Sequence, residues 1–161
     1  YEESRQTLTE ARQIFEDYSG RDSRYIMSIA ACYNYIGDAC RATGDYQSAL
    51  SYYKIAIEKG TGKVVTNGLG QFYSNAGQIY YLLGKIKAAR EYLEQAIACF
   101  ERHGYYWGLE RAEAYMALVL LEQGETEQAE RHYKKGVQLS EKMNNPTTVK
   151  VLKEIKNKAG F

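Results

Sequence analysis

The stretch IGDACRATGDYQSA, residues 36–49, brings together side chains that could do chemistry. It holds two Gly-Asp pairs, at 37–38 and 44–45, with Cys40 between them. A thiol can act as a nucleophile when a base, usually histidine, lies beside it. Glycine-rich turns can also cradle phosphate groups. A thiol active site and a phosphate loop are therefore the first candidates.

Neither chemistry finds its partners in the rest of the chain. The two histidines, His103 and His132, lie far along the sequence, and no Gly-Lys-Ser/Thr follows the glycines. Cys32 and Cys40 are eight residues apart on one predicted helix, too far apart to share a metal ion. The sequence therefore predicts a protein that is not an enzyme, with no catalytic residues, no metal and no cofactor.

The bulk composition limits the partners. The chain has 161 residues and a formal net charge of +1, so no strong field indicates nucleic acid or membrane. The lysines at 150–158 have no aromatic residue among them, which favours a solvated helix over nucleic-acid contact. Three cysteines are an odd number, which is typical of reduced thiols and predicts a cytoplasmic location.

The elements that carry these residues repeat every 40 positions. Glycines recur at 44, 84 and 124, and alanines follow five residues after each. Apolar residues three, four and seven apart precede each glycine, which predicts a helix. The glycine can take the left-handed conformation that ends a helix, and a second helix then begins. One unit is therefore predicted to be a helical hairpin.

The repeat gives Cys40 and the glycine at 37 plain structural roles. Cys40 matches Tyr80 and Leu120 one and two periods later, so it is predicted to fill the core. Gly37 and Gly77 fall inside predicted helices, where each costs about 1 kcal/mol relative to alanine. We expect close contact between two helices to offset that cost.

The period predicts an all-α protein with one domain over residues 1–161. Residues 1–20 match the second helix of a repeat whose first helix is absent, so we expect an excerpt of a longer protein. The predicted repeats span residues 22–60, 64–102 and 106–143. Residues 147–158 are predicted to form a terminal capping helix.

These positions resemble the tetratricopeptide repeat family. The segments YNYIGDACRATGDYQSALSYYKIAI and YSNAGQIYYLLGKIKAAREYLEQAI match its signature closely, and the third copy departs from it at Glu113 and Gly136. The period of 40 is similar to Leu-Gly-Asn-type scaffolds, kinesin light chains and bacterial Rap/PlcR/MalT-type regulators. The resemblance implies a right-handed superhelical stack of antiparallel helical hairpins, which binds a peptide or protein in its concave groove.

The resemblance also implies which residues contact a partner, because the first helix of each hairpin lines the groove in this family. The spacing agrees in part, since Asn34, Asp38 and Arg41 lie three or four apart and share a helix face. A solvated polar face is the alternative. The residues predicted to bind the partner are Asn34, Asp38, Arg41, Gln71, Asn75, Gln78, Tyr81, Arg111 and Tyr115.

The loop HGYYWG, residues 103–108, offers one further contact. Trp107 aligns with the polar Asn67 one period earlier, so it is predicted to be exposed. An exposed tryptophan is typical of a surface that meets a partner.

Chaperone cofactors of this family hold a C-terminal carboxylate in a clamp of basic residues and asparagines. Asn75 and Arg111 match that clamp, but Asn34, Asp38 and Tyr115 replace its other members. Asp38 would repel a carboxylate, so the sequence disfavours a clamp of that kind.

Two functions remain open. The chain is predicted to be a binding module for a protein or peptide. The alternative is the sensor or regulatory arm of a bacterial signalling protein or transcription regulator, with its effector domain outside this chain. Self-association through the exposed N-terminal end, residues 1–11, is a third possibility.

Overall fold

The computed structural model describes residues 1–19, 25–61, 67–104, 106–143 and 145–161. These residues are helical and contain no β-strand, which confirms the predicted all-α class. None of the helices in these ranges is long and apolar enough to cross a membrane. The helices are α1 (Glu2–Ser19), α2 (Ile26–Ala42), α3 (Tyr46–Gly60), α4 (Asn67–Leu82), α5 (Ile86–Arg102), α6 (Leu109–Glu122), α7 (Thr126–Met143) and α8 (Pro146–Ala159).

Short turns with a glycine join the two helices of each hairpin. Gly44, Gly84 and Gly124 have φ values of 82°, 70° and 78°, in the left-handed region that glycine adopts without strain. The next helix begins two residues after each glycine. At the first turn, the carboxylate of Asp45 accepts a hydrogen bond from the amide of Ser48 and caps α3. The chain therefore reverses direction at the predicted positions.

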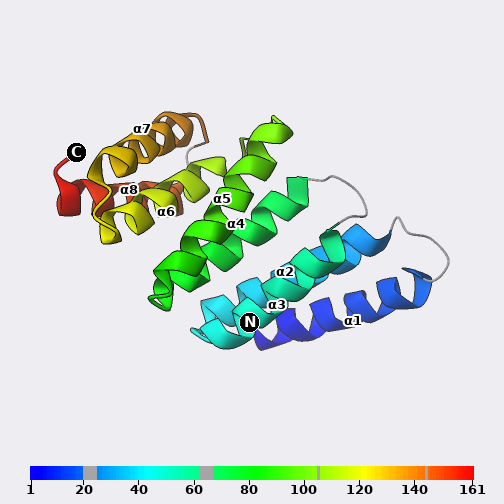
Figure 1. The fold of residues 1–161 in the computed structure, drawn as a ribbon. Helices are drawn as coiled ribbons and strands as arrows, with labels where there is room; N and C mark the ends of the chain where they lie inside the picture. The colour runs from blue at the N-terminus through cyan, green and yellow to red at the C-terminus, as the bar shows by residue number, and fades with distance from the viewer. Residues whose placement is uncertain (20–24, 62–66, 105, 144) are drawn as a thin grey trace.

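The hairpins stack into an α-solenoid. Helices α2 and α3, α4 and α5, and α6 and α7 pair with each other, while α3 packs on α4 and α5 on α6. Figure 1 shows these hairpins side by side along the molecule, with α1 against α2 at one end and α8 against α6 and α7 at the other. The predicted repeat starts at 22 and 64 lie outside the described residues, and the division into repeats stays a prediction.

The two glycines predicted inside helices leave room for a side chain of the facing helix. A Cβ atom on Gly37 would lie 2.6 Å from Cε1 of Tyr53, and one on Gly77 would lie 2.8 Å from Cγ of Leu93. Cys40 is 4% exposed and belongs to the same core as Tyr53 and Leu93. The core role predicted for these positions is therefore confirmed.

The third hairpin replaces a contact between two tyrosines with one between a carboxylate and an imidazole. The rings of Tyr33 and Tyr52 stack with centroids 6.3 Å apart, and the second hairpin repeats this contact 40 residues later at 5.8 Å. At the equivalent place, the Nδ1 atom of His132 lies 2.5 Å from the carboxylate of Glu113. Lys135 also pairs with Glu113, at 2.6 Å. The departure of Glu113 from the family signature is therefore matched by its partners on α7.

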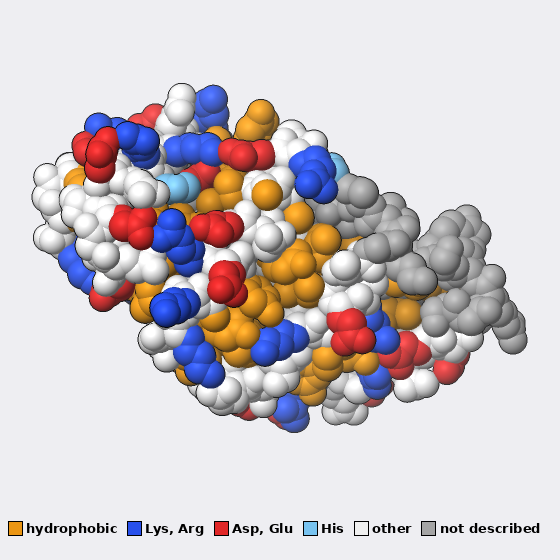
Figure 2. Space-filling view, in the orientation of Figure 1, with side chains coloured by type: hydrophobic (Ala, Val, Ile, Leu, Met, Phe, Trp, Pro, Cys, Tyr) orange, Lys and Arg blue, Asp and Glu red, His pale blue; other side chains and the backbone are white. Residues whose placement is uncertain are grey.

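The outer surface carries charges of both signs. On the face seen in Figure 2, Lys and Arg side chains are interspersed with Asp and Glu side chains, and hydrophobic side chains lie between them. This mixture agrees with the net charge of +1. No single sign of charge dominates this face.

Candidate functional site

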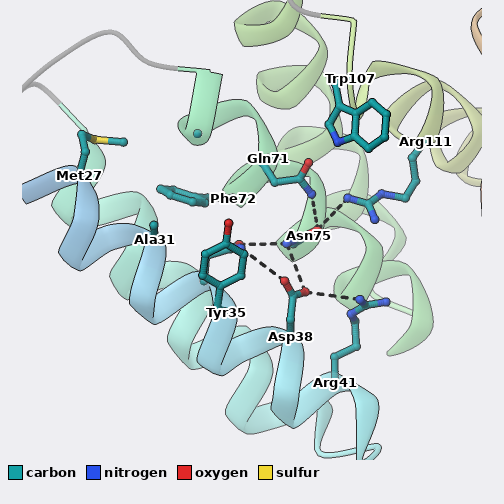
Figure 3. Close-up of a pocket in the computed structure, with 12 residues that line it drawn as sticks. Met27, Ala31, Tyr35, Asp38, Arg41, Gln71, Phe72, Asn75, Trp107 and Arg111 are labelled. Carbon is teal, nitrogen blue, oxygen red and sulfur yellow. Dashed lines mark hydrogen bonds and ion pairs between the residues drawn. The ribbon is translucent and has the colours of Figure 1, made fainter. Parts of the chain in front are cut away.

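A pocket of about 530 Å³ lies where α2, α4 and the start of α6 meet (Figure 3). We call it the three-helix pocket. It draws side chains from three successive hairpins, and each hairpin contributes through its first helix or the loop before it. The residues that line it are Met27, Ala31, Asn34, Tyr35, Asp38, Arg41, Gly68, Gln71, Phe72, Asn75, Trp107 and Arg111.

The structure brings most of the predicted site residues together at this pocket. Those that line it are Asn34, Asp38, Arg41, Gln71, Asn75, Arg111 and Trp107. Gln78, Tyr81 and Tyr115 do not line it. Gln78 is 2% exposed and donates a hydrogen bond to the backbone oxygen of Ser74. Tyr81 and Tyr115 pack edge to face, with ring centroids 5.9 Å apart.

Asp38 is the centre of a hydrogen-bond network. Its carboxylate accepts from the hydroxyl of Tyr53 at 2.7 Å, and from Asn34, Arg41 and Asn75 at 3.4 Å each. Tyr53 comes from α3 and reaches the carboxylate from within the core. Burial, followed by the Asp38 charge, raises the pKa of Tyr53, which keeps its hydroxyl protonated as a donor. The hydrogen bond from the core residue Tyr53 therefore helps to fix the position of the Asp38 carboxylate.

Asn75 joins the helices around the network. Its amide nitrogen donates to Asn34 at 2.9 Å and to Asp38, while its oxygen accepts from Gln71 at 2.8 Å and Arg111 at 3.2 Å. The residue is 2% exposed, and these bonds use both of its hydrogens and its oxygen. Asn75 therefore holds α2, α4 and α6 together, rather than offering free hydrogens to a ligand.

Arg111 is a partly buried cation that makes no ion pair with a carboxylate among the described residues. Its Nη2 donates to Asn75, while its buried Nε has no hydrogen-bond partner among the described residues. Within that same part of the chain, no carboxylate lies within ion-pair distance of it. Burial lowers the pKa of Arg111, and the nearby Arg41 lowers it further. Asp38 and Glu110 act in the opposite direction on the pKa of Arg111, without ion-pair contact.

Apolar side chains form the other part of the pocket lining. Tyr35 and Trp107 are 55% and 56% exposed, and they stand on either side of the polar network in Figure 3. Met27 from α2 and Phe72 from α4 also line the pocket. The exposure predicted for Trp107 agrees with the structure, and its contact with a partner stays a prediction.

The residues predicted to bind the partner do not include Met27, Tyr35 and Phe72, which also line the pocket. A signal for two of them exists in the sequence, since Met27, Ala31 and Tyr35 are four residues apart along one helix face. Positions 67, 71 and 75, and then 107, 111 and 115, repeat that face at intervals of 40. Phe72 gives no such signal, because its equivalents are Cys32 and Ala112.

The structure does not support a nucleophilic role for Cys40. Burial raises the pKa of the Cys40 thiol, which makes the thiolate scarce. His132 pairs with Glu113 in the third hairpin, whereas Cys40 lies in the first. Among the described residues, no group of three or more His, Cys, Asp or Glu side chains could hold a metal ion.

Comparison with known families identifies the repeat. Two sequence profiles, both described as tetratricopeptide repeat, match residues 34–64 and 70–103. The matched segments include most of α2 to α3 and of α4 to α5, the first two complete hairpins.

A curated relative shares part of the chain. The type II methyltransferase M.CeqI of Rhodococcus hoagii is 32% identical over 105 residues, which are 65% of this chain and 20% of that protein. The chain therefore spans about one fifth of the length of this relative.

Solved structures share the fold. The apo form of RapI superposes with a TM-score of 0.83 and 18% identity, covering 98% of this chain and 42% of that one. The first TPR domain of Spaghetti (RPAP3), bound to an HSP90 peptide, gives a TM-score of 0.61 and 17% identity. That match covers 82% of this chain and 94% of the other. Residues 34–64 and 70–103 therefore match the tetratricopeptide repeat, and the described helices share the fold of these solved structures.

Proposed function

We propose that this chain is a non-catalytic binding module that docks a peptide or protein segment in the three-helix pocket. The observation that carries the proposal is the pairing of an ordered polar network with two exposed aromatic side chains, Tyr35 and Trp107. Tyrosine and tryptophan give rigid contact area at low cost in conformational entropy. The network centred on Asp38 and Asn75 is formed without a ligand, so little ordering is needed on the protein side.

The dimensions of the pocket suit part of such a segment. Its volume of about 530 Å³ lies within the range of roughly 300–1,000 Å³ that is typical of ligand sites. The Spaghetti structure holds an HSP90 peptide on the same fold. That peptide belongs to the other protein, and the likeness supports only the choice of a peptide as the first class to test.

A selection from random peptides tests the proposal. Nine-residue peptides are selected on the wild-type chain, and the affinity of the best binder is measured by fluorescence polarisation. Replacing both aromatic side chains, Tyr35→Ala with Trp107→Ala, should weaken binding at least about tenfold, because central aromatic residues dominate such contacts.

Tyr106 provides the matched control. It is 54% exposed and lies next to Trp107 in the chain, but it lines a different pocket with Leu109 and Leu139. Tyr106→Ala should leave affinity unchanged. Equal affinity for the wild type and the Tyr35/Trp107 variant would show that binding takes place elsewhere.

A second candidate function is the sensor or regulatory arm of a bacterial signalling protein or transcription regulator, with the effector domain outside this chain. The relative M.CeqI, which is named a methyltransferase and of which this chain matches only 20%, supports only the idea that the chain can be part of a longer protein. The full-length sequence tests this candidate, since an adjoining effector domain is required. The effector's activity should then change when a pocket-binding peptide is added.

Self-association through residues 1–11 and a cytoplasmic location remain separate predictions. Light scattering on the isolated chain tests the first, because a dimer would have twice the mass of 18.4 kDa. Imaging of the tagged full-length protein tests the second.

A further inference from the structure

Glu110 is a buried carboxylate in the first turn of α6, next to the pocket residue Arg111. It is 1% exposed, and it makes no ion pair within the described part of the chain. A charged group that is buried without an ion pair needs hydrogen-bond donors to replace the water that it has lost. The surroundings of Glu110 therefore have to supply these donors.

Two donors from distant parts of the chain hold the carboxylate. Its Oε2 accepts from the backbone amide of Gly108 at 2.8 Å, and its Oε1 accepts from the side-chain amide of Asn145 at 3.1 Å. Gly108 ends the loop before α6, whereas Asn145 lies directly before α8. Hydrogen bonds to a charged acceptor are stronger than those between neutral groups. Glu110 thus ties the loop before α6 to the start of α8.

Asn145 is itself fixed to α8. Its side-chain oxygen accepts from the backbone amide of Thr147 at 3.1 Å, and its backbone oxygen accepts from the amide of Val149 at 3.0 Å. It is the N-cap of α8, a position that asparagine and aspartate favour equally. One side of the Asn145 amide caps the helix while the other side reaches Glu110. The place of the carboxylate therefore depends on where α8 begins.

Gly108 fixes the backbone beside Trp107. Its φ of 94° is left-handed, and a Cβ atom there would lie 2.8 Å from Oε1 of Gln71 and 3.1 Å from Cζ of Phe100. The loop is therefore pressed against the second hairpin on one side and held by Glu110 on the other. Trp107, the preceding residue, is 56% exposed and lines the three-helix pocket (Figure 3). Because an exposed side chain has few contacts of its own, its backbone largely determines its place.

We propose that Glu110 is a positioning residue for Trp107, and that α8 holds Glu110 in place through Asn145. These hydrogen bonds form a route from α8, which does not line the three-helix pocket, to an aromatic side chain that does. The seating of α8 then regulates the aromatic part of the pocket. The effect on a partner rests on the proposed function, whereas the place of Trp107 can be measured without a partner.

An exchange of carboxylate and amide between the two positions tests the link. In Asn145→Asp two carboxylates face each other, while the cap of α8 is kept, because aspartate caps a helix as well as asparagine does. In Glu110→Gln the amide must turn its hydrogens toward one of its two donors. Each single change should therefore break the link. In the double variant the new amide can donate to the new carboxylate and still accept from Gly108, so the link should return with its polarity reversed.

Trp107 reports the result directly, because it is the only tryptophan in the chain. Each single variant should make its fluorescence easier to quench with acrylamide, and the double variant should quench as the wild type does. Asp45→Asn is the matched control, since it exchanges the same groups at the N-cap of α3 in the first hairpin. It should leave quenching unchanged. Far-UV circular dichroism shows whether each protein keeps its helices, and Asn145→Asp still tests the link if Glu110→Gln unfolds.

Peptide affinity provides the second measurement. The probe is a nine-residue peptide that is selected on the wild-type chain and loses affinity in Trp107→Ala. Each single variant should weaken its binding about two- to tenfold, the effect of one hydrogen bond, and the double variant should regain most of the loss.

The two measurements separate this inference from the proposed function. Unchanged quenching in both single variants would overturn the positioning of Trp107 by Glu110, whatever the peptides do. Increased quenching that the double variant does not reverse would indicate a general loss of packing and would overturn the link to α8. Increased quenching with unchanged affinity for the probe peptide would overturn the regulation of the pocket. If no selected peptide depends on Tyr35 and Trp107, the proposed function fails, while the quenching result still decides the role of Glu110.

Discussion

At the scale of single residues, a core contact and the candidate site share one segment of α2. Gly37 lets the ring of Tyr53 pass against the helix backbone, and the hydroxyl at the end of that ring donates to Asp38 at 2.7 Å. Asp38 follows Gly37 directly in the sequence. The small residue at 37 therefore sets the position of a carboxylate that helps to order the three-helix pocket.

Substitution at Gly37 tests this link. A Cβ at Gly37 would lie 2.6 Å from the Tyr53 ring and 3.2 Å from the backbone oxygen of Ala49, so the two helices must separate. Gly37→Ala should lower the free energy of unfolding by about 1–3 kcal/mol, the usual cost of overpacking. Urea unfolding followed by circular dichroism measures it.

Gly60 is the matched control for that substitution. A Cβ there would lie 3.5 Å from Leu69 and 3.6 Å from Phe72, which are ordinary contacts. Gly60→Ala should leave stability unchanged or raise it slightly, because alanine restricts the unfolded chain. Equal loss in both variants would show that the close approach of Tyr53 is not the reason for glycine at 37, because alanine has the higher helix propensity at both positions.

The sequence predicts the close helix contact at Gly37. It does not predict the hydrogen bonds among Asn34, Asp38 and Asn75. Spacing places Asn34, Asp38 and Asn75 on helix faces, and it gives no measure of how closely two such faces approach. The bond between Asn34 and Asn75 joins residues 41 positions apart, so it depends on how two hairpins stack. For the same reason, spacing alone could not separate Gln78, which is buried, from residues that line the pocket.

At the scale of elements, the third hairpin keeps the geometry of the others with different chemistry. In every hairpin the contact joins residues 19 positions apart, and in the third it joins the carboxylate of Glu113 to the imidazole of His132 in place of two tyrosine rings. Glu113 is fully buried. The sequence marks Glu113 as a departure from the family signature, but it does not identify the partners, which lie on the facing helix. A buried ion pair of this kind is costly to break on one side only.

A double-mutant cycle tests the exchange of chemistry. Glu113→Tyr alone leaves His132 beside a neutral ring, and His132→Tyr alone removes one of the two partners of Glu113 on α7. Each single change should therefore destabilise the hairpin. The double variant restores the tyrosine pair of the other hairpins, and the two changes should couple favourably by about 1 kcal/mol or more. Urea unfolding of the four proteins measures the coupling, and strictly additive effects would refute it.

At the scale of the whole molecule, the period of 40 predicts the hairpins and their order because each hairpin contacts mainly its neighbours. The three-helix pocket is a property of the stack, since its lining comes from three hairpins. No single repeat contains it. The period therefore predicts where a pocket can form. Its chemistry depends on the side chains that contact each other between successive hairpins.

Because each hairpin contacts mainly its neighbours, a destabilising substitution at one end should increase local unfolding only near that end. Ile155 on α8 is fully buried against α6, in a cluster with Leu118 and Leu152. Ile155→Ala should cost about 2–5 kcal/mol, the range for an aliphatic side chain deleted from a core. Because α8 contacts only α6 and α7 among the described helices, hydrogen exchange should accelerate in α6, α7 and α8. Exchange in α2 and α3 should stay as it is in the wild type, and the exposed Lys156→Ala should change neither region. Acceleration along the whole chain would mean that the hairpins unfold as one cooperative unit, and that events at α8 reach α2 and α3.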